Sequence, residues 1–155
     1  MQVRRFEPKD EERVKQLILS ILTREYPFDK SVYENSDLAD IGQVYEGRRD
    51  GFYVLEAEGK IVGTVGVKED SEDTALIRRL FVDPTCRRKG YGELLLSKAI
   101  LHCRHLKFKH IVSRTTGRMA QAINLLKKTH FQEAEKIDLG GFQIFKFILD
   151  LKDDR

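Results

Sequence analysis

Six consecutive residues near the middle of the chain have the composition of a phosphate-binding loop. They are Arg87, Arg88, Lys89, Gly90, Tyr91 and Gly92. Two glycines let the backbone turn sharply and remove the Cβ atoms that would hold a bulky anion away. An apolar helical run follows directly, and the first N–H groups of a helix lack intrahelical partners and carry partial positive charge. The stretch is therefore predicted to bind a phosphate group, with three basic side chains at its rim.

The glycine spacing excludes two common phosphate-binding motifs. The P-loop requires G-x-x-x-x-G-K-[ST] and the dinucleotide fingerprint requires G-x-G-x-x-G, and neither pattern occurs. The pattern present is R-x-x-G-x-G, filled by Arg87, Gly90 and Gly92. A basic helix N-terminus without any function is the alternative interpretation.

The segments on either side of the loop add to this pattern. An apolar run at 75–82 precedes it and ends in Asp83 and Pro84, and a leucine-rich run at 93–101 follows it. Strand, glycine loop and helix in this order resemble the coenzyme A loop of the GNAT N-acetyltransferase superfamily.

The rest of the chain supplies the elements that would position this loop. Apolar runs and alternation predict strands at 2–6, 52–57, 61–67, 75–82, 110–114, 131–137 and 142–149. Helical spacing predicts helices at 14–22, over a short stretch around 38–45, at 93–101, and from Met119 to about Thr129. This order is similar to the GNAT fold along nearly the whole chain. We expect one α/β (α+β) domain, residues 1–155, with a mixed, mostly antiparallel sheet flanked by helices.

The resemblance implies that acetyl-CoA binds as the acetyl donor. Its pantetheine arm would lie where the sheet splays open, with its amides pairing to the backbone of Leu80, Phe81 and Val82. The pyrophosphate would rest on the N–H groups of residues 88–92, with Arg87 at the edge. Asn124, on the following helix, faces either the cofactor or solvent.

Acetyl transfer to an amine sets chemical requirements of its own. The amine must lose a proton before it attacks, and a free alkylamine has a pKa of about 10, so a general base near neutrality helps. The tetrahedral oxygen needs hydrogen-bond donors, for which backbone N–H groups at a strand bulge are suitable. No covalent enzyme intermediate is required.

The chain departs from the family at its usual polar positions. Where many GNAT enzymes carry a glutamate early in the fourth strand, this chain has Leu76. In the helix that follows, Met119 and Leu126 stand at the asparagine and tyrosine positions, and His130 stands at the glycine position. The usual acid and base assignments therefore cannot be carried over.

Two residues are candidate replacements for the general base. Glu69 ends the third predicted strand, where it would act through a water molecule or simply be a solvated carboxylate. His130 has a suitable unperturbed pKa, about 6.5, but could equally cap the preceding helix.

Candidate acceptor-binding residues are Tyr26, Tyr33 and Arg78. The two tyrosines lie in the irregular segment 24–51, where they either bind the acceptor or pack as buried aromatics. Arg78 and Arg79 are expected to alternate across their strand. One of them would then favour an acidic acceptor, and the other would be a surface charge.

Composition limits the other classes of function. Lys and Arg total 28 against 25 Asp and Glu, an excess too small for a dedicated nucleic-acid-binding protein. Cys86 and Cys103 have no metal-binding spacing, so we expect no metal and a reducing, cytoplasmic setting. No apolar run reaches the length of a membrane span, and the N-terminus does not have the pattern of a signal peptide. A homodimer is compatible with the pattern but not required by it.

The sequence thus favours an acetyl-CoA-dependent N-acetyltransferase acting on a primary amine of a small molecule, amino acid or protein. A catalytically silent acetyl-CoA-binding sensor is the alternative, since the usual glutamate and tyrosine are missing. A third hypothesis is a nucleic-acid-binding domain that uses the basic residues at 87–89 and 105–110.

Overall fold

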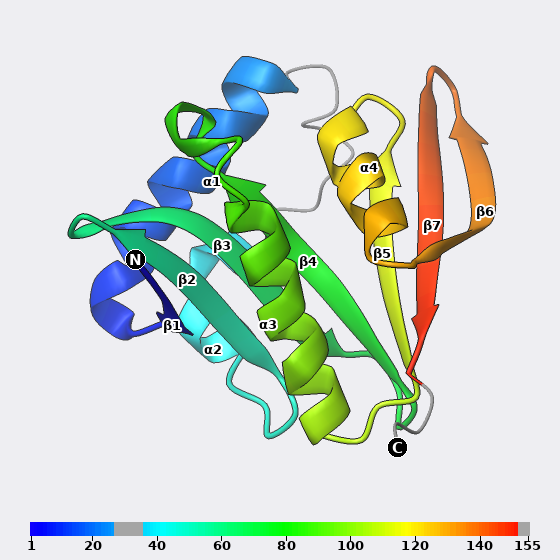
Figure 1. Cartoon of the computed structure of the whole chain (residues 1–155), viewed down its shortest axis with the longest axis horizontal. Helices are drawn as coiled ribbons and strands as arrows, with labels where there is room; N and C mark the ends of the chain where they lie inside the picture. The colour runs from blue at the N-terminus through cyan, green and yellow to red at the C-terminus, as the bar shows by residue number, and fades with distance from the viewer. Residues whose placement is uncertain (27–35, 152–155) are drawn as a thin grey trace.

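The computed structural model describes residues 1–26 and 36–151, which form one seven-stranded sheet with helices on both faces (Figure 1). The strand order is β1-β2-β3-β4-β5-β7-β6. The strands are β1 (Gln2–Arg5), β2 (Gly51–Ala57), β3 (Lys60–Glu69), β4 (Thr74–Val82), β5 (His110–Thr116), β6 (Gln132–Leu139) and β7 (Phe142–Asp150). The α-helices are α1 (Glu11–Glu25), α2 (Ile41–Val44), α3 (Tyr91–His105) and α4 (Ala120–Lys128), and 3₁₀ turns lie at η1 (Pro8–Asp10), η3 (Ser36–Ala39) and η4 (Pro84–Cys86).

The predicted mixed, mostly antiparallel sheet is confirmed. Only β4 and β5 pair in parallel, and the other five strand pairs are antiparallel. The leucine-rich helix runs further than its predicted end at Leu101, because α3 continues to His105. In the part of the chain that the structure describes, no helix is long and apolar enough to cross a membrane.

Helices cover the two faces of the central strands (Figure 1). On one face, α3 buries Leu95, Leu96, Ala99 and Cys103 against the sheet. On the other face, α1 buries the predicted apolar stripe, which consists of Val14, Leu17, Ile18, Ile21 and Leu22. The middle of the sheet is thus buried on both sides, which holds β3 and β4 in place.

The sheet opens at its centre, between β4 and β5. These strands pair only as far as Ile77 and Ser113, after which they diverge (Figure 1). Beyond that point β4 still pairs with β3 up to Val82, and β5 still pairs with β7 up to Thr116. The second half of β4 therefore has one paired edge and one open edge.

A β-bulge lies where the opening begins. Arg79 and Leu80 together oppose Val65, since Thr64 pairs with Phe81 and Gly66 pairs with Arg78. Arg79 has a φ of 56°, in the left-handed region that side chains other than glycine rarely adopt. Its carbonyl oxygen accepts a hydrogen bond of 2.7 Å from the Thr64 hydroxyl, which fixes the bulge to β3.

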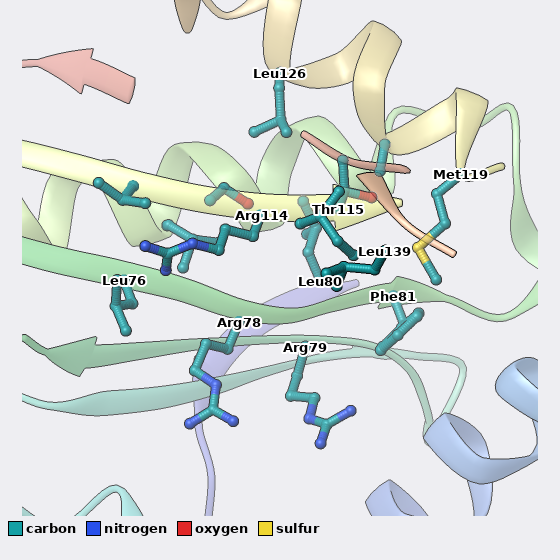
Figure 2. A pocket seen from close by; sticks show the side chains of 15 residues that line it. Leu76, Arg78, Arg79, Leu80, Phe81, Arg114, Thr115, Met119, Leu126 and Leu139 are labelled. Atoms are coloured by element: carbon teal, nitrogen blue, oxygen red, sulfur yellow. The ribbon is translucent and has the colours of Figure 1, made fainter. Parts of the chain in front are cut away.

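The bulge overturns the predicted alternation of Arg78 and Arg79. Both guanidinium groups approach Asp37 on η3, and Figure 2 shows both side chains extending to the same side of β4. The period of two fails here because the extra residue of a bulge shifts the side-chain direction. Arg79 is also no surface charge, since it is only 7% exposed.

Asp37 is the centre of a buried polar network. Its carboxylate accepts hydrogen bonds from Arg79 Nε at 3.0 Å and Nη2 at 2.7 Å, and from the Tyr45 hydroxyl at 2.8 Å. Arg78 Nη2 lies 3.9 Å from the same carboxylate. Burial acts to raise the pKa of Asp37, but the hydrogen bonds from Arg79 and Tyr45 and the charges of Arg79 and Arg78 together outweigh it, and the pKa lies below its usual value. Burial raises the pKa of Tyr45, so this hydroxyl stays protonated and donates.

Removal of the charge on Asp37 should destabilise the fold strongly. The substitution Asp37→Asn removes the carboxylate charge that binds the buried Arg79 guanidinium, and we expect the free energy of unfolding to fall by about 3–5 kcal/mol. The control Tyr45→Phe removes one neutral donor from the same carboxylate and should cost about 1 kcal/mol. Urea unfolding of both variants measures the difference. Equal losses would mean that the ion pair contributes no more to stability than the neutral hydrogen bond does.

Candidate functional site

A cavity of about 470 Å³ lies where β4 and β5 part (Figure 2). Below we call it the central cavity. Strands β4, β5, β6 and β7 and helix α4 contribute its walls, which are mostly aliphatic. The lining residues are Leu76, Ile77, Arg78, Arg79, Leu80, Phe81, Val112, Ser113, Arg114, Thr115, Met119, Ala122, Leu126, Leu139 and Ile144.

A second cavity of about 440 Å³, the loop cavity, lies beside the glycine loop. It shares Leu80, Phe81, Met119 and Ala122 with the central cavity, so the two adjoin. Its lining includes nine of the ten residues predicted to bind the cofactor, namely Leu80, Phe81, Val82, Arg87, Arg88, Gly90, Tyr91, Gly92 and Asn124. Lys89 is the exception; its ammonium lies 6.0 Å from the centre of the Tyr91 ring.

The backbone of the glycine loop has the shape of an anion-binding turn. Arg88 has a φ of 67° and Gly90 a φ of 78°, so two left-handed residues precede the first turn of α3. Left-handed residues in such turns direct neighbouring N–H groups toward one concave side. The first N–H groups of α3, which begins at Tyr91, have no carbonyl one turn earlier to bond. The loop thus combines backbone donors with the positive end of a helix dipole.

The Arg87 side chain connects the glycine loop to β4 and α1 through hydrogen bonds. Its Nε donates to the Val82 carbonyl at 3.1 Å, and its Nη1 donates to Glu25 Oε1 at 2.7 Å. These bonds tie the loop to the end of β4 and to the last residue of α1. The Arg87 guanidinium therefore has protein partners of its own at the edge where the sequence predicts a pyrophosphate contact.

The open edge of β4 presents backbone groups to the opening. The Asp83 N–H bonds to the Val62 carbonyl at 2.7 Å, and Phe81 pairs with Thr64, so these two residues face β3. In an antiparallel ladder the residues between them turn their N–H and C=O groups the other way. The backbone of Val82, which lies between them, consequently faces the opening between β4 and β5, and Leu80 lies at the bulge and lines both cavities.

The positions where related enzymes carry acid and base groups line this opening but are apolar. Leu76, Met119 and Leu126 all border the central cavity, and Leu126 is 1% exposed. Among the described lining residues there is no Asp, Glu or His. The central cavity therefore has no acid or base side chain of the usual kind.

The two predicted base candidates lie outside the central cavity. Glu69 accepts a hydrogen bond from Arg49 at 2.9 Å and pairs with Ala75, at the end of β4 where β4 and β5 still pair. His130 is exposed and follows α4, and its N–H bonds to the Lys127 carbonyl at 3.1 Å. Neither location supports the role of general base.

His130 instead ends α4 in a left-handed conformation. Its φ is 76°, which explains why the family pattern has glycine at this position. The chain continues into Phe131, whose N–H bonds to the Leu126 carbonyl at 2.9 Å and closes the helix end.

The predicted acceptor-binding residues do not line one common cavity in the structure. Arg78 lines the central cavity, whereas Tyr26 lines the loop cavity beside the cofactor candidates. Tyr33 lies outside the described residues.

Two residues of β5 that sequence reasoning missed also line the central cavity. Thr115 is 5% exposed, and its hydroxyl has no hydrogen-bond partner among residues 1–26 and 36–151. Arg114 is exposed, and its side chain extends into the space between β4 and β5 (Figure 2). The signal was the run of four polar residues, 113–116, in a strand that begins with apolar alternation.

Comparison with known proteins gives the family. A sequence model described as the acetyltransferase (GNAT) family matches residues 15–131. The chain belongs to this family. The predicted GNAT resemblance and fold are confirmed.

An acetyltransferase from Staphylococcus aureus Mu50 has a similar structure, with a TM-score of 0.86, 20% identity, and coverage of 97% of this chain and 99% of that one. A second similar structure, from Salmonella typhimurium, contains acetyl-CoA, and it has a TM-score of 0.78, 19% identity, and coverage of 100% and 96%.

Curated GNAT relatives are longer than this chain. An uncharacterized N-acetyltransferase of Methanocaldococcus jannaschii is 31% identical over 119 residues, which make up 71% of this chain and 52% of that protein. The N-acetylaspartate synthetase of Xenopus tropicalis is 30% identical over 105 residues, which make up 66% of this chain and 39% of that protein. The chain thus spans about half the length, or less, of these two relatives.

The left-handed conformation of His130 yields a prediction for stability. The substitution His130→Gly should raise the free energy of unfolding by about 1 kcal/mol, because glycine adopts this conformation without steric cost. His130→Ala keeps the strained backbone and should bring no such gain. Thermal unfolding of both variants measures the effect, and a loss of stability in His130→Gly would show that the imidazole makes a stabilising contact.

Proposed function

We propose that this protein is an acetyl-CoA-dependent N-acetyltransferase that acetylates a primary amine by direct attack on the thioester. The observation that carries the proposal is the continuous opening that leads from the glycine loop, along the free edge of β4, into the sheet centre. Family membership supports it, as does the acetyl-CoA in the similar Salmonella structure. Similarity to a protein named N-acetylaspartate synthetase supports an amino acid as acceptor.

The residues around the opening fit this donor. The left-handed turns at Arg88 and Gly90 and the start of α3 offer N–H groups to a pyrophosphate, with Lys128 at the rim. Leu80 and Val82 offer backbone groups to the amides of a pantetheine arm, in the manner of an added strand. When bound, acetyl-CoA supplies an acetyl group activated as a thioester.

In the proposed acetyl transfer, backbone atoms of the protein contribute more than side chains do. In the reaction a nitrogen–carbon bond forms, the carbon–sulfur bond breaks, the amine loses a proton and the thiolate gains one. Leu80 lies at the bulge and lines both cavities, so its N–H is the proposed donor for the negative oxygen that develops on the acetyl group.

Deprotonation of the amine is assigned to solvent, since no acid or base side chain lines the central cavity in the described ranges. If so, kcat/KM should rise with pH in proportion to the unprotonated fraction of the amine, whose pKa is about 10 for an alkylamine. The variants Glu69→Gln and His130→Gly should keep this profile. A plateau beginning near neutrality would instead reveal a general base on the protein.

The test of the function is release of CoA thiol from acetyl-CoA across amines, amino acids, polyamines and peptides. Turnover above background hydrolysis with one class of acceptor supports the enzyme. Calorimetric titration with acetyl-CoA measures donor binding separately. Binding without turnover across the panel would contradict catalysis and leave a donor-binding domain, and failure to bind acetyl-CoA would contradict the assignment of the glycine loop.

Thr115 is proposed to hydrogen-bond the thioester end of the bound donor. Its hydroxyl is buried, unpartnered within the described chain, and borders the same cavity as Leu126, where related enzymes carry a tyrosine. A hydroxyl of this kind is too weak an acid to give up its proton outright. It can stabilise the developing thiolate by a hydrogen bond.

The variant Thr115→Val should move stability and activity in opposite directions. Removal of an unsatisfied buried hydroxyl should raise the free energy of unfolding by about 1 kcal/mol, while loss of the hydrogen bond should lower kcat about tenfold. Thr115→Ser keeps the hydroxyl and should retain most of kcat. Unfolding and steady-state assays measure both effects, and an unchanged kcat in Thr115→Val would exclude the proposed contact.

A further inference from the structure

The charged groups that line the central cavity are all cationic. Arg78, Arg79 and Arg114 border it, and the described lining residues include no carboxylate to balance them. The rest of the lining is aliphatic, apart from the hydroxyls of Ser113 and Thr115. Aliphatic walls lower the local dielectric constant, so these charges act on a bound ligand more strongly than they would on an open surface.

The nearest carboxylate neutralises only one of these arginines. Asp37 lies behind β4, is 2% exposed, and holds Arg79 through two hydrogen bonds. Arg78 stands 3.9 Å from the same carboxylate, and its side chain remains 31% exposed. Among the described residues, one carboxylate thus faces two guanidinium groups at this wall.

Arg114 adds a second uncompensated charge across the opening. It follows Ser113, the last residue of β5 that pairs with β4. On its other side β5 pairs with β7, where Lys146 lies directly opposite Arg114. No ion pair of Arg114 occurs within residues 1–26 and 36–151, whereas Lys146 lies 3.9 Å from Glu135. Glu135 therefore offsets the charge of Lys146, while the Arg114 guanidinium stays available to an anion.

Arg78 and Arg114 belong to the same face of the sheet. Ile77 pairs with Ser113 in parallel register, so the next residue of each strand points to the other face, and these residues are Arg78 and Arg114. Figure 2 shows the Arg114 side chain extending between β4 and β5 toward Leu76. Any acceptor that enters from this face meets Arg114 on its way to the sheet centre.

We infer that the acceptor carries a carboxylate close to its amine and that Arg114 binds this carboxylate, with Arg78 adding to the positive potential. The inference rests on the proposed N-acetyltransferase function and names its acceptor class as amino acids. Guanidinium groups bind carboxylates through paired, charge-assisted hydrogen bonds, which orients the rest of the acceptor. Polyamines and amino acid amides would bring positive charge without a counter-ion and are disfavoured.

Matched acceptors test the inference. Release of CoA thiol is measured for amino acids and for the corresponding amino acid amides, which lack the carboxylate. Because this change also lowers the pKa of the amine, kcat/KM is compared per unprotonated amine. The wild type should prefer the acids by at least about tenfold in kcat/KM, as expected for a hydrogen bond to a charged group. In Arg114→Gln this preference should disappear, mainly through a rise in KM for the acids, with little change for the amides.

A charge-matched control separates local binding from the overall field. Arg48 is exposed and lies outside the lining of the central cavity, so Arg48→Gln removes the same charge and should keep the preference for acids. A wild type that prefers amides or polyamines would overturn the inference. So would an acid preference that survives in Arg114→Gln.

A binding measurement keeps this test separate from the proposed function. In the presence of CoA, N-acetylalanine should raise the unfolding temperature of the wild type more than N-acetylalaninamide does, and Arg114→Gln should abolish the difference. Turnover of no acceptor would contradict the proposed function, while equal effects of these two ligands would overturn the carboxylate subsite.

Discussion

The buried ion pair between Asp37 and Arg79 is the interaction on which the geometry of the site depends. A left-handed arginine in a strand costs on the order of 1–2 kcal/mol, and it persists only where its surroundings fix it. Here the side chain is held by Asp37 and the carbonyl oxygen by Thr64. The resulting bulge includes Leu80, which lines both cavities, so an ion pair buried on one face of the sheet fixes the strand edge that borders the opening.

The opening exists because its two strands have different partners. Strand β4 stays with β3, and β5 stays with β7, after their mutual pairing ends at Ile77 and Ser113. Helices α1 and α3 cover the half of the sheet that contains β4 and prevent it from following β5. The unpaired edge of β4 is therefore a stable part of the fold.

The sequence could predict the glycine loop, the order of elements and the sheet type, because local patterns determine each of them. It could not predict that Arg79 turns to the side of Arg78, since a bulge depends on the pairing of β4 with β3. It could not place Arg87 on Glu25 or Glu69 on Arg49, because these contacts join residues 62 and 20 positions apart. Thr115 and Arg114 were missed because polar residues in a strand acquire a role only once the neighbouring strand has separated.

The open edge of β4 also affects how far the sequences of proteins with this fold can differ. Every residue type except proline supplies the same N–H and C=O groups, so the proposed acetyl-CoA site on the main chain of Leu80 and Val82 would survive replacement of the side chains around it. Similar structures retain this fold at TM-scores of 0.86 and 0.84 with only 20% identity. On the proposed assignment, the side chains that line the cavity, Arg114 among them, can change with the acceptor without loss of the main-chain groups along β4.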